Sequence, residues 1–232
     1  RPPFFVESDQ VDCSNPVLAL LPLNTCKAAI ADYLRAPMTH NDSQGASRRA
    51  VLLLEDGTRF EGGAIGATGT TTGEVAFNTG MYGYQEIFTD PSYKGQVLVM
   101  ATAHIGNYGI HSQENESGST QIAGLVVRNF SEVASRIGDI EPLADRLERD
   151  GIVGIADIDT RALIQHIRDC GAMNALISND GTPESELLGR LKETPSMEGL
   201  ELSSGVTRQD PEDAGDPGSP VRIALLDLGN KE

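Results

Sequence analysis

Short apolar runs broken by turn residues dominate the first part of the chain after residue 50. Asp56-Gly57, between Val51–Leu54 and Arg59–Ile65, is a dipeptide expected at a tight β-hairpin turn. Apolar or alternating residues predict further strands over Glu74–Thr79, Gln96–Ala103 and Ile122–Val127. This part of the chain is therefore predicted to be mainly β-sheet.

Helices and strands alternate after residue 140. Residue spacing predicts the helices Glu141–Arg149, Thr160–Asp169 and Pro183–Lys192 and the strands Ile152–Ala156 and Ala175–Ser178. Pro142, Asp159 and Thr182 are residue types favoured at helix starts, and Gly151 and Gly171 are placed to end the first two helices. Strands followed by helices indicate a mixed α/β domain with helices laid on one side of its sheets.

Both ends of the chain differ from this central part. Residues 208–220 have three prolines and four acids, which is typical of an interdomain linker. Residues 221–232 begin with a continuous apolar strand of the kind buried in a parallel sheet. Residues 1–48 look like a leader or disordered arm, with Met38 as a candidate true start; a small docking helix over Ala28–Leu34 is the alternative.

The excess of acidic over basic residues limits the classes of partner that the chain is expected to bind. Lys and Arg total 18 against 34 Asp and Glu, which gives a formal net charge of -16. This argues against nucleic acid, whose phosphates need a cationic face, and against an anionic membrane surface. No apolar run reaches the length of a membrane span, and Val17–Leu23 contains Pro22 and makes a poor signal peptide. The cytoplasm is the expected compartment.

Metal and cofactor chemistry has little support in the sequence. The three cysteines and four histidines show no CxxC or HxxxH spacing. Asp159 fits a helix cap and Asp157 a strand end better than a metal pair, and His104 fits a structural histidine better than a general base. Gly66–Gly69 lacks the lysine of a phosphate loop. Cys170 is expected to be a half-buried packing residue, and no metal or cofactor is expected in this chain.

The segment Gly73–Gln96, GEVAFNTGMYGYQEIFTDPSYKGQ, concentrates turn formers, aromatics and polar residues. It starts as a strand, breaks at Gly80 and Gly83, and ends in the turn Asp90-Pro91-Ser92-Tyr93, where Asp bonds forward to the backbone and Pro fixes φ. A loop of this kind between two strands is where binding groups usually lie. Composition alone favours a tight connection whose polar groups satisfy their own backbone.

The order of motifs is more specific than the composition. This segment occurs with five others, Ala50–Thr58, Gly66–Gly69, His104–Asn107, Gly124–Arg128 and Ile155–Arg161. Together they resemble the N-terminal domain of the small, glutamine-using subunit of carbamoyl-phosphate synthetase. The resemblance implies a layered β/β/α domain over residues 49–207. It also implies that residues 221–232 are the truncated start of a flavodoxin-like class I glutaminase domain, so that the chain is a fragment.

The resemblance also implies a function. The small subunit hydrolyses L-glutamine and passes ammonia to a large subunit, which makes carbamoyl phosphate from bicarbonate with ATP and Mg²⁺, for arginine and pyrimidine biosynthesis. The nucleophilic cysteine and its His and Glu partners would lie beyond residue 232, so no catalytic residue is expected here and the fragment alone is expected to be inactive. Ser92 is the residue that would contact the bound glutamine; the alternative is a hydroxyl that caps its own turn.

A second class of function is a non-catalytic β/β/α module that binds a partner and no glutamine. The DNA past residue 232 discriminates the two, because a Gly-x-Cys-x-Gly elbow there would support the amidotransferase. The sequence also leaves open whether Gln85 and Glu86 bind a partner surface or close their loop on itself.

Overall fold

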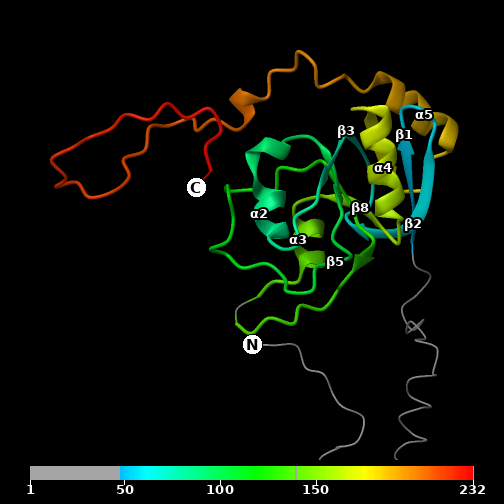
Figure 1. The fold of residues 1–232 in the computed structure, drawn as a ribbon, viewed down its shortest axis with the longest axis horizontal. Helices are drawn as coiled ribbons and strands as arrows, with labels where there is room; N and C mark the ends of the chain where they lie inside the picture. Colours follow the sequence, from blue (N-terminus) through cyan, green and yellow to red (C-terminus); the bar gives the residue numbers. More distant parts are fainter. Residues whose placement is uncertain (1–47, 139, 232) are drawn as a thin grey trace, which may run out of the picture. The chain divides into compact units, whose positions relative to one another are not determined.

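The computed structural model describes residues 48–138 and 140–231 (Figure 1). The arm over residues 1–37 and the docking helix over Ala28–Leu34 lie outside the described residues. In the described part of the chain, no helix has both the length and the apolar character that crossing a bilayer requires.

The predicted hairpin is confirmed. Strand β1 (Arg49–Leu54) pairs antiparallel with β2 (Arg59–Gly66), with Val51 opposite Glu61. The backbone N–H of Thr58 donates to Oδ1 of Asp56 at 2.8 Å, and Gly57 takes a positive φ of 90° that a glycine adopts without strain. The turn residues therefore fix the register from which the rest of the sheet is built.

Seven strands close into a barrel among the described residues. The five beyond the hairpin are β3 (Thr70–Asn78), β4 (Val97–Met100), β6 (Gly124–Val126), β8 (Val153–Ala156) and β9 (Asn174–Ser178). Their order around the ring is β1-β2-β8-β6-β4-β3-β9, and β9 pairs with both β1 and β3. The mixed α/β class is confirmed. The layered β/β/α description stays a prediction, because the strand pairing forms one ring.

Successive side chains point to opposite faces of each strand, so the hydrophobic core is divided into separate clusters. One set of side chains, which includes Val97, Val99 and Ile155, packs with helix α4 (Thr160–Cys170). The intervening residues Leu98 and Met100 face helices α2 (Tyr84–Thr89) and α3 (Leu143–Arg149).

A third cluster joins Leu53 and Leu176 to helix α5 (Glu184–Glu193). Figure 1 shows α2 and α3 on the side of the barrel away from α5. Helices thus cover more than one side of the sheet, and the expectation of helices on a single side is wrong. The physical reason is that these strands are buried on both faces, so each face needs a cover.

The observed helix ends agree with the predicted caps at α4 and differ from the prediction at α5. Asp159 caps α4 by accepting a hydrogen bond from the N–H of Ala162 at 3.1 Å, and Gly171 follows the helix with a positive φ, both as predicted. The prediction that Thr182 caps α5 is wrong. Pro183 is the residue before α5, and the hydroxyl and N–H of Thr182 donate to Oδ1 of Asp180 instead.

Four short elements are not predicted by the sequence pattern. Helix α2 and the 3₁₀ turn η1 (Pro91–Tyr93) lie within the segment expected to be a loop. Strands β5 (His104–Ile105) and β7 (Asn129–Phe130) form a small parallel pair outside the barrel. Elements of two to six residues carry too few periodic positions for a pattern to identify them.

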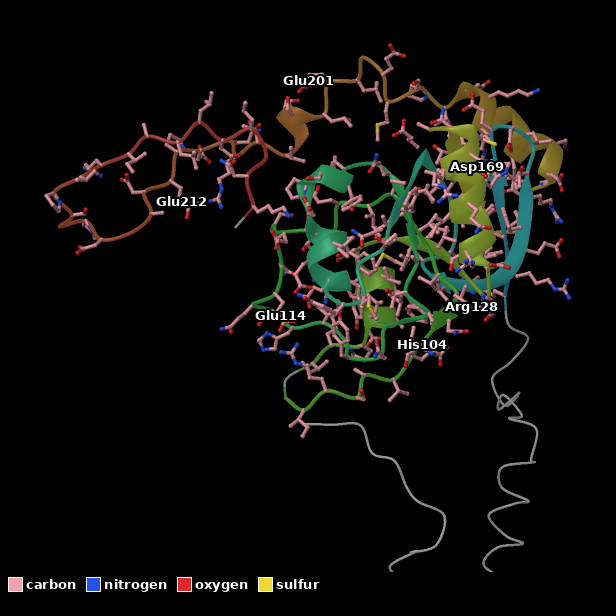
Figure 2. All side chains as sticks on the ribbon, in the orientation of Figure 1. His104, Glu114, Arg128, Asp169, Glu201 and Glu212 are labelled. Carbon is pink, nitrogen blue, oxygen red and sulfur yellow. The ribbon has the colours of Figure 1, made fainter. Side chains whose placement is uncertain are left out.

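The C-terminal part has one short 3₁₀ turn, η2 (Ser203–Gly205), and its residues from 208 to 231 are exposed except for the half-buried Asp227 and Gly229. The strand expected from Val221 does not form here; Ile223 is 87% exposed and Leu225 is 78% exposed. A single strand has no backbone partners, and none of the described strands pairs with this segment. The linker and domain boundaries therefore stay predictions. The acidic side chains labelled in Figure 2 at Asp169, Glu201 and Glu212 are all exposed.

Candidate functional site

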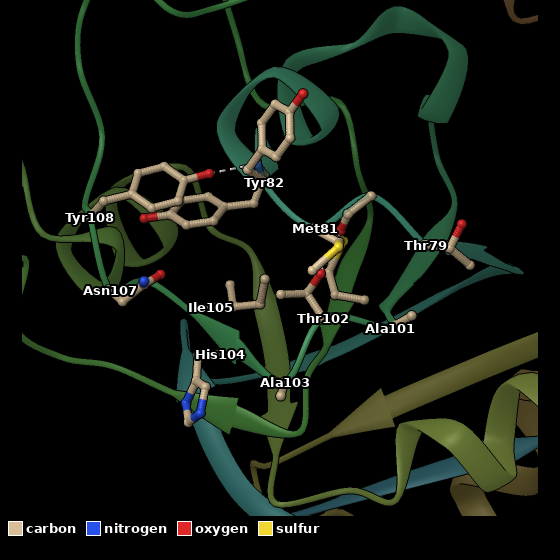
Figure 3. A pocket seen from close by; sticks show the side chains of 13 residues that line it. Thr79, Met81, Tyr82, Ala101, Thr102, Ala103, His104, Ile105, Asn107 and Tyr108 are labelled. Atoms are coloured by element: carbon tan, nitrogen blue, oxygen red, sulfur yellow. Dashed lines mark hydrogen bonds between the residues drawn. The ribbon is translucent and has the colours of Figure 1, made fainter. Parts of the chain in front are cut away.

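Helix α2 packs the motif segment against the barrel. Tyr84 is 2% exposed, and its hydroxyl donates to the carbonyl oxygen of Gly109 at 2.9 Å. Its ring stacks on Tyr108 with the centroids 4.1 Å apart, and the Tyr108 hydroxyl accepts hydrogen bonds from the N–H groups of Gly83 and Tyr84 (Figure 3). Burial raises the pKa of both tyrosines, so both hydroxyls stay protonated and act as structural groups.

Gln85 closes the loop on itself, which settles one alternative that the sequence left open. Its side chain is 1% exposed. The amide nitrogen donates to the carbonyl oxygen of His111 and to Oδ1 of Asn115, and the amide oxygen accepts from the N–H of His111. The side-chain amide of Gln85 therefore holds the segment after residue 110 against α2, with its nitrogen donating twice and its oxygen accepting once.

The Asp90–Tyr93 turn is held by its own side chains and by strand β3. The N–H of Ser92 donates to Oδ1 of Asp90 at 2.9 Å, as the sequence predicted for this turn. The Tyr93 hydroxyl accepts from the side-chain amide of Asn78 at 2.9 Å. Ser92 itself is exposed at the apex, so the turn presents a hydroxyl on a fixed backbone.

Ser92 borders a pocket of about 300 Å³. Its other walls include Lys94 and Gln96 on the same side of the turn, with Met197, Leu202 and Val206 from the segment after α5. The chain returns to this place near its end, because Nζ of Lys231 lies 2.8 Å from Oδ2 of Asp90. The turn, the post-α5 segment and the last described residues are thus brought together around Ser92.

The electrostatics of the turn depend on Asp90. Partial burial opposes ionisation, yet the contacts with Lys231 and with both the N–H and the hydroxyl of Ser92 outweigh it and lower the pKa of this carboxyl. The Ser92 hydroxyl therefore contributes to its own turn, which is the alternative role considered from the sequence. A hydroxyl both donates and accepts, so this contact leaves capacity for a second partner.

Replacing Asp90 by asparagine tests this electrostatic contribution. A folded-state pKa below the ordinary 3.8 means that the charge stabilises the fold above that pH, and that the stabilisation disappears as pH falls through the lowered value. We expect Asp90→Asn to cost about 0.5–1 kcal/mol at pH 7, since Lys231 is half exposed, and progressively less below pH 4. Urea unfolding followed by circular dichroism from pH 7 to pH 3 measures this; a cost that is independent of pH would contradict it.

A larger pocket of about 500 Å³ lies between residues 79–84 and residues 100–108 (Figure 3). Its rim carries Met81 and Tyr82, each 84% exposed, and its walls include Thr102 and His104. His104 starts β5 and is exposed, which matches the expected strand-end position. The hydroxyl of Thr102 donates to the carbonyl oxygen of Gly80, so the turn that forms the rim is fixed to the wall.

The remaining sequence candidates fall in separate places. Asp157 directly follows β8 with a positive φ of 64°, and Asp159 is the α4 cap, so the two have the structural positions predicted for them. Gly66 ends β2, where a Cβ would overlap the carbonyl oxygen of Ile152. Cys170 is exposed rather than half-buried, and this prediction is wrong because the residue lies on the outer face of the last turn of α4.

One cluster was missed. Asp56, His166 and Cys170 place ligand atoms within 4.8 Å of one another, although 110 residues separate the first two. The available signal is the His166-x-x-x-Cys170 spacing at the end of the predicted helix Thr160–Asp169, which places both side chains on one face because α4 extends one residue further, to Cys170. A search restricted to HxxxH and CxxC patterns passes over that combination.

Comparison with known proteins assigns the family. The family model described as "Carbamoyl-phosphate synthase small chain, CPSase domain" matches residues 52–177. The carbamoyl phosphate synthase small chain of Parasynechococcus marenigrum is 40% identical over 199 residues, which cover 80% of this chain and 52% of that protein. The small chain of Akkermansia muciniphila is 46% identical over 154 residues, covering 66% of this chain and 41% of that protein.

A solved aminopeptidase from Aneurinibacillus sp. strain AM-1 aligns with a TM-score of 0.36 at 15% identity over 59% of this chain and 31% of that chain, which is too low to carry a conclusion. The match to the family model falls on the mixed α/β barrel, from β1 to β9. The chain belongs to the carbamoyl-phosphate synthase small chain family. It spans about half the length of the curated relatives that it matches.

Proposed function

We propose that this chain is the N-terminal part of the small subunit of a glutamine-hydrolysing carbamoyl-phosphate synthase. In this proposal a flavodoxin-like class I glutaminase domain follows it and hydrolyses L-glutamine. The ammonia passes to the large subunit, which uses bicarbonate, ATP and Mg²⁺ to make carbamoyl phosphate in arginine and pyrimidine biosynthesis. The described domain acts as a layered β/β/α unit that docks on the large subunit in the cytoplasm and completes the glutamine pocket with Ser92.

The observation that carries the proposal is the surroundings of Ser92. The family places its glutaminase domain after the position where this chain reaches residue 221. In the structure the last described residues lie beside the Ser92 turn: Lys231 contacts Asp90, and Gly229 is packed near Val206 and Pro91. In this proposal the glutaminase domain begins at residue 221, and its first residues therefore run up to the exposed hydroxyl of Ser92.

The chemistry of a serine suits this role. Its hydroxyl can accept from the α-ammonium group of glutamine or donate to the α-carboxylate. The turn is held by Asp90 and by the Tyr93–Asn78 hydrogen bond, so little freedom is lost when the hydroxyl binds a substrate. A hydrogen bond to a charged group contributes about 1.5–3 kcal/mol.

Ser92→Ala, made in the complete small subunit assembled with its large subunit, tests the assignment. We expect the KM for glutamine to rise roughly 10- to 100-fold, because one hydrogen bond to a charged head group is lost. Synthesis from free ammonia should be unchanged, since it bypasses the glutamine pocket. Both rates are measured as carbamoyl phosphate formed per unit time.

The matched control is Ser185→Ala, which removes an exposed hydroxyl on α5 and should alter neither rate. Equal loss with glutamine and with ammonia in Ser92→Ala would show that Ser92 supports the fold or the subunit contact and not the substrate. An unchanged glutamine KM would leave the hydroxyl with its turn-capping role alone.

A further inference from the structure

A cluster of three potential metal-ligating side chains lies outside the proposed glutamine site. Nε2 of His166 is 2.5 Å from Oδ2 of Asp56, and Nδ1 of the same ring is 3.9 Å from Sγ of Cys170. Within residues 48–138 and 140–231, this is the one place where at least three His, Cys, Asp or Glu side chains gather closely enough to hold an ion. The imidazole therefore lies between a carboxylate and a thiol.

Helix α4 and the β1–β2 turn hold the three side chains of the cluster in place. His166 and Cys170 are four residues apart on α4, so their side chains lie on one face of the helix. Leu163 and Ile167 are buried on the face that packs on the barrel, which turns the His–Cys face outward. Asp56 sits in the β1–β2 turn, which is tied by the backbone hydrogen bond from Leu54 N–H to the Thr58 carbonyl oxygen.

The distances between the three side chains indicate a different role for Asp56 than for His166 and Cys170. Two ligands of one tetrahedral zinc ion, at about 2.05 Å for nitrogen and about 2.3 Å for sulfur, lie roughly 3.6 Å apart. The 3.9 Å between Nδ1 and Sγ is close to that value. The 2.5 Å between Nε2 and Oδ2 is too short for two ligands of one ion, but it suits a hydrogen bond.

We propose that His166 Nδ1 and Cys170 Sγ form a binding site for a thiophilic divalent cation of the Zn²⁺ class. Asp56 is a positioning residue: its carboxylate accepts the Nε2–H of His166 and thereby directs the Nδ1 lone pair toward the ion. This carboxylate–imidazole–metal arrangement is the common support of zinc-bound histidines. Water or a further ligand completes the tetrahedron on the exposed side.

The electrostatic surroundings favour a cation at this place. The site lies at the C-terminal end of α4, where the helix dipole is negative. The chain as a whole carries a formal charge of -16, which raises the local concentration of cations. Metal binding would release the proton of the Cys170 thiol to solvent, because the thiolate is the form that ligates a metal.

The same order of groups, carboxylate to imidazole to thiol, occurs in activated cysteine nucleophiles. The position on the helix distinguishes the two interpretations. A bare thiolate is stabilised at a helix N-terminus, whereas Cys170 is the last residue of α4. The metal site is therefore the better fit, and nucleophilic reactivity becomes an outcome that the experiment can detect.

The experiment titrates Co²⁺ and then Zn²⁺ into the reduced chain in which Cys13 and Cys26 are replaced by serine, so that Cys170 is the only thiol. We expect one equivalent of Co²⁺ to give a sulfur-to-cobalt charge-transfer band in the near ultraviolet, and Zn²⁺ to displace it. Cys170→Ser should abolish the band. His166→Ala should weaken Co²⁺ binding at least tenfold, since the chelate is lost.

Asp56→Asn provides the test of the positioning role. It should keep the charge-transfer band and weaken the Co²⁺ affinity about 10- to 100-fold, the usual effect of losing such a support. His104→Ala removes an exposed histidine elsewhere and should leave binding unchanged. Circular dichroism checks that each variant is folded, which is the expected result because Asp56 and Cys170 are exposed and His166 is only half-buried.

Several results would overturn the proposal. One is a band that survives Cys170→Ser, and another is an affinity that is unaffected by His166→Ala. A third is rapid alkylation of Cys170 by iodoacetamide at neutral pH that added Zn²⁺ does not slow, which would establish the nucleophile instead. If Asp56→Asn bound Co²⁺ like the parent chain, the role of Asp56 would be wrong.

Discussion

Replacing Gly62 by alanine should destabilise the domain by about 3 kcal/mol or more. Gly62 lies in β2 where this strand passes against β8, and a Cβ at this position would overlap the carbonyl oxygen of Ala156. The side chains of Ile155 and Ile158, each 3.1 Å from that Cβ position, block movement to the side. Relief would require β2 and β8 to separate, and this pairing is one of the links that close the barrel.

The matched control is Gly189→Ala in helix α5, where a Cβ would meet no atom within 4 Å outside its own helix. Alanine is the better helix former, so this variant should be more stable by about 0.5–1 kcal/mol. Urea unfolding of both variants, followed by circular dichroism, gives the two changes in the free energy of unfolding. Equal midpoints would mean that β2 and β8 have more room at Gly62 than the structure shows.

The second large effect is expected for Gln85→Met. Methionine has a similar volume but cannot hydrogen-bond, so the N–H of His111 and Oδ1 of Asn115 lose their partner, and the carbonyl oxygen of His111 keeps only the N–H of Glu114. Each half-buried group left unpaired costs about 1–3 kcal/mol, less where water can reach it. We expect a loss of about 3 kcal/mol in the free energy of unfolding.

Gln96→Met makes the same change of side chain at a half-buried position. The Gln96 side chain has a single weak hydrogen bond to Glu74, at 3.3 Å, and the change should cost less than about 0.5 kcal/mol. Hydrogen exchange at residues 111–116 adds a second readout, because those amides should lose protection in Gln85→Met only. Similar costs for both variants would show that the Gln85 network contributes little.

Much of the secondary structure follows from local residues. The hairpin at Asp56-Gly57 and the cap of α4 at Asp159 form because the turn and cap hydrogen bonds lie within a few residues of each other. The Ser92 turn is in the same class, since Asp90 is two residues away. Predictions of this kind require no knowledge of the fold.

The predictions that the structure contradicts concern features that tertiary contacts determine. Thr182 was predicted to be a cap, but Asp180 competes for its hydroxyl and is itself held by Thr70 from β3. Cys170 was predicted to be half-buried, whereas its exposure depends on which face of α4 meets the barrel. Helix α2 forms because Tyr84 and Gln85 are anchored by residues 108–115, and no periodic pattern records that anchoring.

The sequence by itself determined the family, the mixed α/β class and the turn that carries Ser92. The motifs along the chain identify the family, and the hydrogen bonds of the turn join residues that are close together in the sequence. The tertiary structure alone decided that the strands close into a ring, that Lys231 returns to Asp90, and that Asp56 meets His166 across 110 residues. These contacts depend on strand pairing and on shared burial, which bring distant positions together only when the whole domain folds.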